Sequence, residues 1–134
     1  MGSDDPDASG SERDDLSGLK VLIAEDEAIV AMGLVDIVED ESGRVVGPFA
    51  SVSDCLSSIA NALPDLAILD LRLVDGETLS VASLLADHGV PIVFHSGHMS
   101  DGDWDSPHAA VLYCGKPCSE TEMKRALLSA ARMS

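Results

Sequence analysis

Five short apolar runs recur along the chain, and segments with a helical pattern separate them. Most positions in each run are apolar on both parities, which is typical of strands in a parallel sheet that helices cover on both faces. Strands that alternate with helices form doubly wound α/β sheets with right-handed crossovers. We therefore predict an α/β fold of the (βα)5 type, with strands at Lys20–Ala24, Arg44–Pro48, Leu66–Leu69, Pro91–His95 and Ala110–Cys114.

Period and capping residues mark the helices between these strands. Ser51 with Asp54, and Ser119 with Glu122, have the spacing of capping boxes and predict two helix starts. The segment 97–109 lies where the helix after the fourth strand is due, but it contains Gly, Pro and Asp without a helical period. We predict that this helix 4 is short or irregular, or that a loop replaces it.

The length and charge of the chain limit its domain count and its partners. A chain of 134 residues has the size of one domain. Its 24 acidic and 8 basic residues give a net charge of −16, which disfavours binding to nucleic acid or to an anionic membrane surface. Residues 1–18 are acidic with few apolar side chains, so we predict a disordered acidic N-terminal arm before one domain at 19–134.

Location and thiol state also follow from composition. No apolar run approaches the ~18 residues of a membrane span, and the N-terminus does not resemble a signal peptide. We therefore expect a cytoplasmic protein. In such a chain the odd set of Cys55, Cys114 and Cys118 predicts reduced thiols rather than disulfide bonds.

Charged and polar residues follow the predicted strands at their carboxyl ends. Glu25 and Asp26 come after the first strand, Asp70 after the third, Ser96 after the fourth and Lys116 after the fifth. In an open parallel sheet the functional crevice lies beyond these strand ends. Clustered carboxylates repel one another unless a cation lies among them, and Mg²⁺ prefers such oxygen ligands. The sequence therefore predicts a Mg²⁺ site at this edge of the sheet.

The stretches VLIAEDE, LAILDLRL, IVFHSGH and LYCGKPC resemble the receiver domain of two-component response regulators, in order over essentially all of residues 19–134. The resemblance implies a flavodoxin-like strand order of 2-1-3-4-5 and a cis peptide bond between Lys116 and Pro117. It makes Asp70 the phosphoacceptor, Ser96 the switch hydroxyl and Lys116 the phosphoryl-binding lysine.

The same resemblance implies that Glu25, Asp26, Asp70 and the backbone carbonyl of Arg72 hold Mg²⁺, with Glu25 acting partly through water. Some positions depart from the common receiver pattern, because Glu25 replaces an aspartate and Cys118 replaces an aromatic residue. The short segment between Asp70 and Ser96 is similar to receivers with the FATGY-type motif that are common in alphaproteobacteria.

Three further residues receive a switch or gating role. Tyr113 matches the switch aromatic of the family, although an ordinary core aromatic is an equal interpretation. Arg72 and His98 are bulky residues two positions beyond Asp70 and Ser96, and we expect them to control the approach of water to the phosphoryl group. The alternative is that Arg72 points to solvent and that His98 belongs to a mobile loop. His95 with His98 is a weak metal-binding pattern, and a solvated role is preferred.

The resemblance implies a stand-alone response regulator that a sensor histidine kinase phosphorylates. Such a protein catalyses only its own phosphorylation and dephosphorylation, so it is not a classical enzyme. It would signal through contact with a downstream protein, or act as a phosphate sink that competes with another response regulator.

Other classes have the same fold or a similar site. Haloacid-dehalogenase-like phosphatases have a D-x-D motif, but here Arg72 stands where the second aspartate would be. A flavin or nucleotide site needs a phosphate-binding loop after the first strand, where residues 25–27 are acidic and repel phosphate. A pseudo-receiver that binds partners without phosphorylation remains an alternative.

Overall fold

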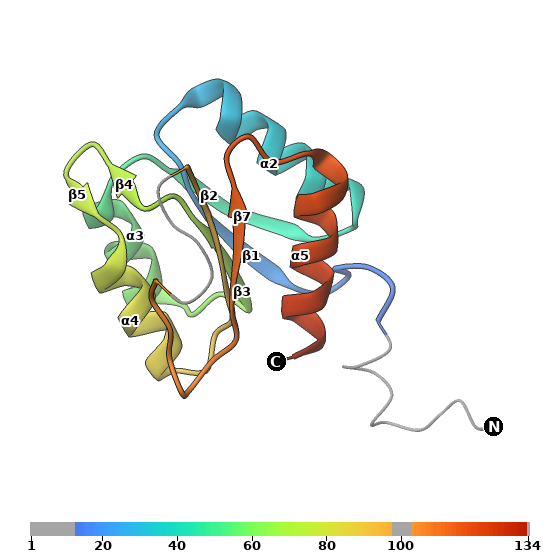
Figure 1. Cartoon of the computed structure of the whole chain (residues 1–134). Helices are drawn as coiled ribbons and strands as arrows, with labels where there is room; N and C mark the ends of the chain where they lie inside the picture. Colours follow the sequence, from blue (N-terminus) through green and yellow to red (C-terminus); the bar gives the residue numbers. More distant parts are fainter. Residues whose placement is uncertain (1–12, 98–102, 134) are drawn as a thin grey trace.

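The computed structural model describes residues 13–97 and 103–133, with a 5-stranded parallel sheet at its centre (Figure 1). The sheet order is β2-β1-β3-β6-β7, which is the predicted flavodoxin-like order 2-1-3-4-5 when only the sheet strands are counted. Each predicted strand is present, and no boundary moves by more than one residue. The strands are β1 (Lys20–Ala24), β2 (Arg44–Phe49), β3 (Leu66–Leu69), β6 (Ile92–Ser96) and β7 (Val111–Gly115).

Helices cover both faces of the sheet, as Figure 1 shows. They are α2 (Ala28–Asp40), α3 (Val52–Asn61), α4 (Leu79–Asp87) and α5 (Glu120–Arg132). Val21 and Ile23 of β1 join the core beneath α2 and α5, whereas Leu22 and Ala24 join the core beneath α3 and α4. Every second residue of a strand points to the same face. The two-sided burial explains why the strands are apolar on both parities.

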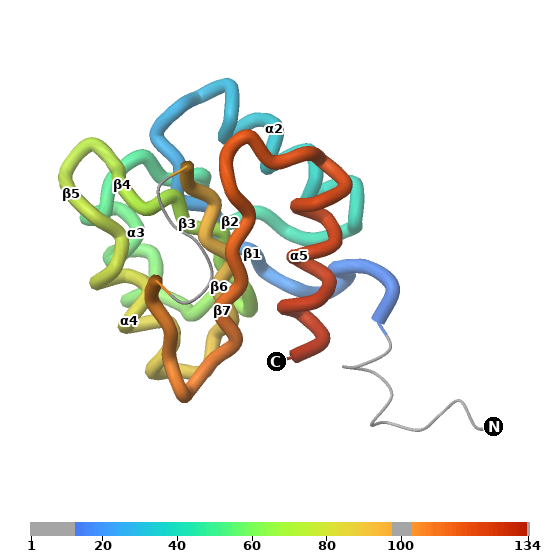
Figure 2. The backbone as a smooth tube through the Cα atoms, in the orientation of Figure 1, coloured from blue at the N-terminus to red at the C-terminus, as the bar shows by residue number. Residues whose placement is uncertain are grey.

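The connection from β6 to β7 contains no helix among its described residues, which are Gly97 and 103–110 (Figure 2). This agrees with the prediction that helix 4 is irregular or replaced by a loop. Residues 98–102, which include the candidate gating residue His98, lie outside the described part of the chain. Within the described part, no helix is both long enough and apolar enough to cross a bilayer.

A short antiparallel hairpin follows β3, and the sequence patterns did not predict it. It consists of β4 (Arg72–Leu73) and β5 (Gly76–Glu77). The carboxylate of Asp75, between the two strands, accepts hydrogen bonds from the backbone N–H groups of Val52 at 2.6 Å and Ser53 at 3.1 Å. The hairpin therefore caps the start of α3 from a distant part of the chain.

Replacing Asp75 with Ala is expected to lower the Tm by a few degrees at neutral pH, because the first N–H groups of α3 lose their acceptor. The hydrogen bond from Val52, more than any other contact, lowers the pKa of Asp75. The stability that the Asp75 carboxylate adds to the folded state is therefore complete above its unfolded-state pKa. This stability is lost as the pH falls through its lower folded-state pKa. Thermal unfolding of both proteins over a pH series measures this difference.

The matched control is Asp87→Ala at the last residue of α4. A negative charge near a helix C-terminus is unfavourable, so this variant should keep or slightly raise the Tm. An equal loss of Tm in the two variants, or a loss for Asp75→Ala that does not change with pH, would contradict the capping role.

The packed body begins before the predicted boundary at residue 19. Leu16 is fully buried, and its N–H donates to the Glu41 carbonyl at 2.8 Å. The carbonyl of Arg13 accepts from Arg132 Nε at 3.0 Å. Residues 13–18 therefore pack against the domain, because one large apolar side chain within an acidic segment is enough to anchor it. Residues 1–12 lie outside the described part of the chain.

The predicted caps are present. Ser119 and Glu122 form a complete capping box at the start of α5. At the start of α3, the Ser51 side chain accepts the N–H of Asp54 at 3.1 Å.

Candidate functional site

Strand pairing brings Asp70 and Glu25 to the same edge of the sheet. In the parallel pair of β1 and β3, Ala24 lies opposite Leu69, so the next residue of each strand lies side by side. The Asp70 N–H donates to the Ala24 carbonyl at 2.9 Å, which ties the backbone of Asp70 to β1. The Glu25 N–H donates to the Phe49 carbonyl of β2 at 2.9 Å. Both carboxylates therefore leave a rigid sheet edge.

Glu25, Asp26 and Asp70 form a cluster in which one oxygen of each carboxylate lies within 4.8 Å of the others. Glu25 is 3% exposed, while Asp26 is exposed to solvent. Three carboxylate oxygens at this spacing are a hard donor set that fits Mg²⁺. The predicted metal-binding carboxylates therefore come together, and the cluster meets the chemical requirements of a Mg²⁺ site.

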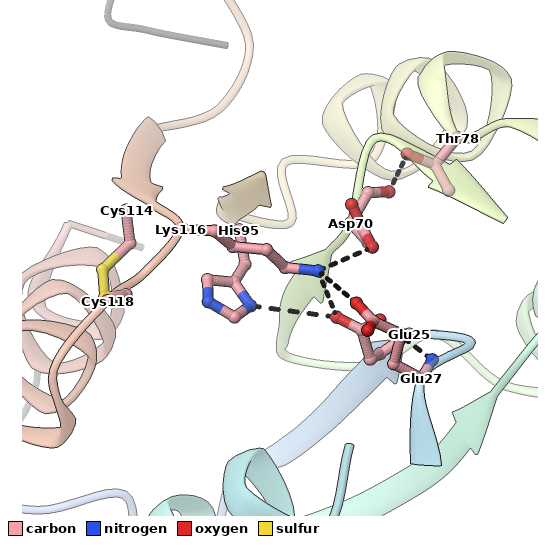
Figure 3. Close-up of polar contacts among 8 residues, drawn as sticks. All are labelled: Glu25, Glu27, Asp70, Thr78, His95, Cys114, Lys116 and Cys118. Atoms are coloured by element: carbon pink, nitrogen blue, oxygen red, sulfur yellow. Dashed lines mark hydrogen bonds and ion pairs between the residues drawn. A yellow bond between two sulfur atoms is a disulfide. The ribbon is translucent and has the colours of Figure 1, made fainter. Parts of the chain in front are cut away.

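Lys116, which follows β7, provides the positive charge among these carboxylates (Figure 3). Its Nζ lies 3.0 Å from Asp70 Oδ2, 3.1 Å from Glu25 Oε1 and 3.5 Å from Glu27 Oε1. The peptide bond between Lys116 and Pro117 is cis, as the family resemblance implied. A single ammonium group therefore neutralises part of a strongly acidic pocket.

The pKa directions follow from burial and from these ion pairs. Burial raises the pKa of Glu25, the nearby Asp70 charge adds to this, and the hydrogen bond from the Glu27 N–H with the Lys116 charge opposes it. Burial alone would lower the pKa of Lys116, but its hydrogen bonds with Asp70 and Glu25 raise it above its usual range. Lys116 is therefore a permanent cation at physiological pH.

A pocket of about 370 Å³ opens at this edge of the sheet. Asp70, Arg72, Ser96 and Lys116 all line it, so the structure brings together four of the predicted site residues. Ser96 is buried at the end of β6 and is 3% exposed. The remaining lining residues are Glu27, Leu71 and Gly97.

The candidate gating and switch residues lie around this pocket in different ways. The side chain of Arg72 is 71% exposed, and its guanidinium pairs with Glu77 at 3.2 Å across the hairpin. Tyr113 stacks on Phe94 with ring centroids 5.5 Å apart, and its hydroxyl bonds both the N–H and the carbonyl of Trp104. Tyr113 is therefore part of an aromatic group beside the site and does not line the pocket itself.

Sequence reasoning missed three residues near the site. Glu27 was given no role at the site, yet its carboxylate reaches Lys116. His95 was expected in solvent but is 6% exposed, with Nδ1 3.9 Å from Glu25 Oε1. His95 lies within β6, and all residues of this strand are buried. Thr78 was not considered, although its hydroxyl contacts the Asp70 carbonyl.

The prediction of reduced thiols at Cys114 and Cys118 is wrong, because a disulfide joins them across the turn that contains Lys116 and Pro117 (Figure 3). Their Cα atoms are 6.0 Å apart, within the usual range for disulfides. The cysteine count gives no information on this distance, which depends on the path of the turn. Cys55 is free and buried, and burial raises the pKa of its thiol to about 12.

Residues 21–128 of the chain match the response regulator receiver domain family. The chain therefore belongs to the receiver domain family of bacterial two-component response regulators, and this membership points to a signalling protein rather than to a classical enzyme.

Solved structures share the fold. The response regulator PhyR from Brucella abortus has a TM-score of 0.75 at 24% identity, over 92% of this chain and 51% of its own. SdrG from Sphingomonas melonis Fr1 has a TM-score of 0.66 at 34% identity, over 87% of this chain and 96% of its own. A third structure is the receiver domain of the sensor histidine kinase PA1611 from Pseudomonas aeruginosa PAO1, solved with magnesium coordinated in its active site cleft. It has a TM-score of 0.71 at 20% identity, over 86% of this chain and 98% of its own.

Curated relatives are longer than the region that they share with this chain. The chain spans 30% and 37% of the length of two transcriptional regulators of Mycobacterium tuberculosis that it matches.

Proposed function

We propose that this receiver accepts a phosphoryl group on Asp70 from a phosphohistidine of a sensor histidine kinase, in a Mg²⁺-dependent reaction. The ion pair between Lys116 and Asp70 carries most of the support, because it places a permanent cation 3.0 Å from the proposed nucleophile. The pocket beside it is open to a phosphoryl donor. Membership of the receiver family makes this reaction the expected one.

The transfer is an in-line displacement at phosphorus. A carboxylate oxygen of Asp70 forms the new P–O bond while the P–N bond to the kinase histidine breaks, and the imidazole nitrogen keeps the electron pair and takes up a proton. Catalysis of such a step is mainly positioning and neutralisation of charge. Lys116 compensates the charge of the phosphoryl oxygens, and the backbone bond from Asp70 to Ala24 holds the nucleophile in place.

We infer that Asp26 and Asp70 hold Mg²⁺ directly, with Glu25 acting partly through water and the Arg72 backbone carbonyl as a further ligand. When bound, Mg²⁺ supplies positive charge that neutralises the phosphoryl oxygens and the carboxylates around them. The close spacing of the three carboxylates supports this ligand set. Glu25 is longer than the usual aspartate and bonds the Glu27 N–H at 3.1 Å, which favours its water-mediated role.

The aspartyl phosphate would present new acceptor oxygens to the Ser96 hydroxyl at the same pocket. Ser96 and Tyr113 lie on the paired strands β6 and β7, and Tyr113 stacks on Phe94, two residues before Ser96 on β6. A movement of the Ser96 loop would therefore change the packing of this aromatic group, which is how we propose that phosphorylation reaches the surface.

The location, the subfamily and the partners of the protein are further parts of this proposal. We propose a cytoplasmic receiver of the FATGY-motif type, with a kinase and a downstream protein or competing regulator as partners, and with no nucleic acid or membrane contact of its own. The alternative of a phosphorylation-independent pseudo-receiver is less supported, because Asp70, Ser96 and Lys116 share one pocket. A phosphatase-like enzyme is also less supported, because the position two residues after Asp70 is an exposed arginine.

Phosphotransfer provides the direct test. The purified protein should incorporate phosphoryl label from acetyl phosphate, and from the phosphorylated kinases of its host, only when Mg²⁺ is present. No incorporation from any of these donors would exclude the proposed reaction and favour the pseudo-receiver.

Arg72 is expected to slow hydrolysis of the aspartyl phosphate, because it lines the pocket two residues beyond Asp70. It is free to leave the exposed pair with Glu77, which is worth little in water. A charge-assisted contact with a phosphoryl oxygen would then block the approach of water. Arg72→Ala should shorten the phosphoryl lifetime about threefold to tenfold, with His98→Ala adding to the effect.

Label loss after removal of the donor measures this lifetime. Arg44→Ala is the matched control, since Arg44 begins β2 at the opposite end of the parallel sheet. An unchanged lifetime in both Arg72→Ala and His98→Ala would show that Arg72 only points to solvent. A long lifetime in the parent protein would favour a signal carrier over a phosphate sink.

A further inference from the structure

Thr78 lies immediately before α4 and is completely buried. Its hydroxyl oxygen lies 2.6 Å from the backbone carbonyl oxygen of Asp70 (Figure 3). It also lies 3.2 Å from the backbone carbonyl oxygen of Leu71. Its N–H also donates to the Leu71 carbonyl at 2.8 Å. One residue thus holds two successive carbonyl groups of the segment that carries the proposed phosphoacceptor.

These contacts are unusual for a threonine at the N-cap of a helix. Threonine is favoured there because its oxygen accepts a hydrogen bond from the N–H two or three residues later. The Thr78 side chain makes no such cap bond, and its backbone, at φ −87° and ψ 8°, is outside the extended region typical of caps. The hydroxyl is used for the Asp70 segment and not for the start of α4.

The backbone N–H and the backbone carbonyl of Asp70 both have hydrogen-bond partners. Its N–H donates to the Ala24 carbonyl of β1 at 2.9 Å, and its carbonyl accepts the Thr78 hydroxyl. Strand β3 ends at Leu69, so Asp70 lies outside the residues of β3 that pair with β1 and β6. A buried carbonyl that loses its donor is free to rotate or must find water.

We propose that Thr78 is a positioning residue for phosphoryl transfer, acting through the backbone of Asp70 and Leu71. It does not line the pocket and does not touch the reacting atoms. By fixing these two peptide groups it sets the direction of the Asp70 carboxylate toward Lys116, and it sets where the next carbonyl, that of Arg72, is presented. This inference rests on the proposed function of Asp70.

The expected effect is on rate and on Mg²⁺ affinity. A misplacement of about 1 Å at a reacting group can reduce a rate by about a hundredfold, so a partial loss of positioning should lower it about tenfold. Thr78→Val keeps the side-chain shape and removes the hydroxyl, whereas Thr78→Ser keeps the hydroxyl. We expect Thr78→Val to slow phosphorylation by acetyl phosphate about tenfold, and Thr78→Ser to stay within about twofold of the parent.

A structural control separates positioning from stability. Asp65→Ala removes the side chain that accepts the Lys20 N–H at 2.8 Å, at the end of β3 opposite to Asp70, and should lower the Tm without changing the rate. All proteins are compared at a temperature where circular dichroism shows them to be folded. Should Thr78→Val fail to fold, the pair Thr78→Ser and Thr78→Ala, which differ only in the hydroxyl, gives the same comparison.

Mg²⁺ titration followed by the backbone amide signals of residues 70–72 is a readout that needs no phosphoryl transfer. Thr78→Val should weaken Mg²⁺ binding severalfold, while Thr78→Ser should not. A Val variant with the parent's rate and Mg²⁺ affinity, or a Ser variant as impaired as Val, would overturn the positioning role. If the parent itself takes up no phosphoryl group, the proposed function fails, and the Mg²⁺ comparison still decides whether Thr78 positions this segment.

Discussion

Asp70→Asn is expected to reduce phosphoryl incorporation to background, with acetyl phosphate and with a phosphorylated kinase alike. The amide that replaces the carboxylate is not a nucleophile at phosphorus and carries no charge for Mg²⁺. Among the described residues, Glu27 is the only other carboxylate that lines the pocket, and it is farther from Lys116, at 3.5 Å against 3.0 Å for Asp70. Autoradiography of phosphorylated protein, or intact mass spectrometry, measures the incorporation.

The fold should survive this substitution. Asn keeps the backbone bond to Ala24 and removes one of several carboxylates that repel each other. The matched control is Asp65→Asn just before β3, at the opposite end of the same strand, where the side chain accepts the Lys20 N–H at 2.8 Å. This control should be phosphorylated as the parent is. Label on Asp70→Asn comparable to the parent would show that another residue is the acceptor.

The parallel sheet could be predicted from the sequence because burial on both faces leaves a local signal. Each of the five runs is apolar on both parities, and pairing of parallel strands then places all carboxyl ends at one edge. Asp70, Ser96 and Lys116 are found together for that reason alone. No knowledge of side-chain geometry is needed to expect the pocket at this edge.

The hairpin of β4 and β5 could not be predicted in the same way. Two-residue strands are too short to show a period. The role of Asp75 depends on the start of α3, more than 20 residues earlier in the chain. The burial of Leu16 is a similar case, since a single apolar residue in an acidic segment gives no pattern, and its partner is the distant Glu41.

Contacts made by long or rotatable side chains could not be predicted from the sequence either. The sequence indicates that Lys116 follows β7, but the division of its charge between Asp70, Glu25 and Glu27 depends on side-chain conformations. No local sequence pattern points to the role of Thr78. Only the structure shows that the Thr78 hydroxyl binds the Asp70 carbonyl and not a backbone group of α4.

The second large effect is expected at the metal-binding carboxylates. Asp26→Asn should raise the Kd for Mg²⁺ at least about tenfold, which is about 1.4 kcal/mol of binding free energy. Asp26 belongs to the cluster of three carboxylates within 4.8 Å, so its loss removes both a ligand and a charge. Phosphorylation at limiting Mg²⁺ should fall in parallel, and saturating Mg²⁺ should restore part of it.

Glu27→Gln is the matched control, because it removes the same charge from the adjacent residue. Glu27 is outside the three-carboxylate cluster, and its carboxylate contacts Lys116 at 3.5 Å. Its loss should raise the Kd for Mg²⁺ less than about threefold, through the long-range effect of one exposed charge. Isothermal calorimetry measures both affinities, and Trp104 fluorescence gives a second readout, since this ring packs 5.7 Å from Phe94 beside the site. Equal weakening in the two variants would show that only the total charge matters, and that Asp26 is not a direct ligand.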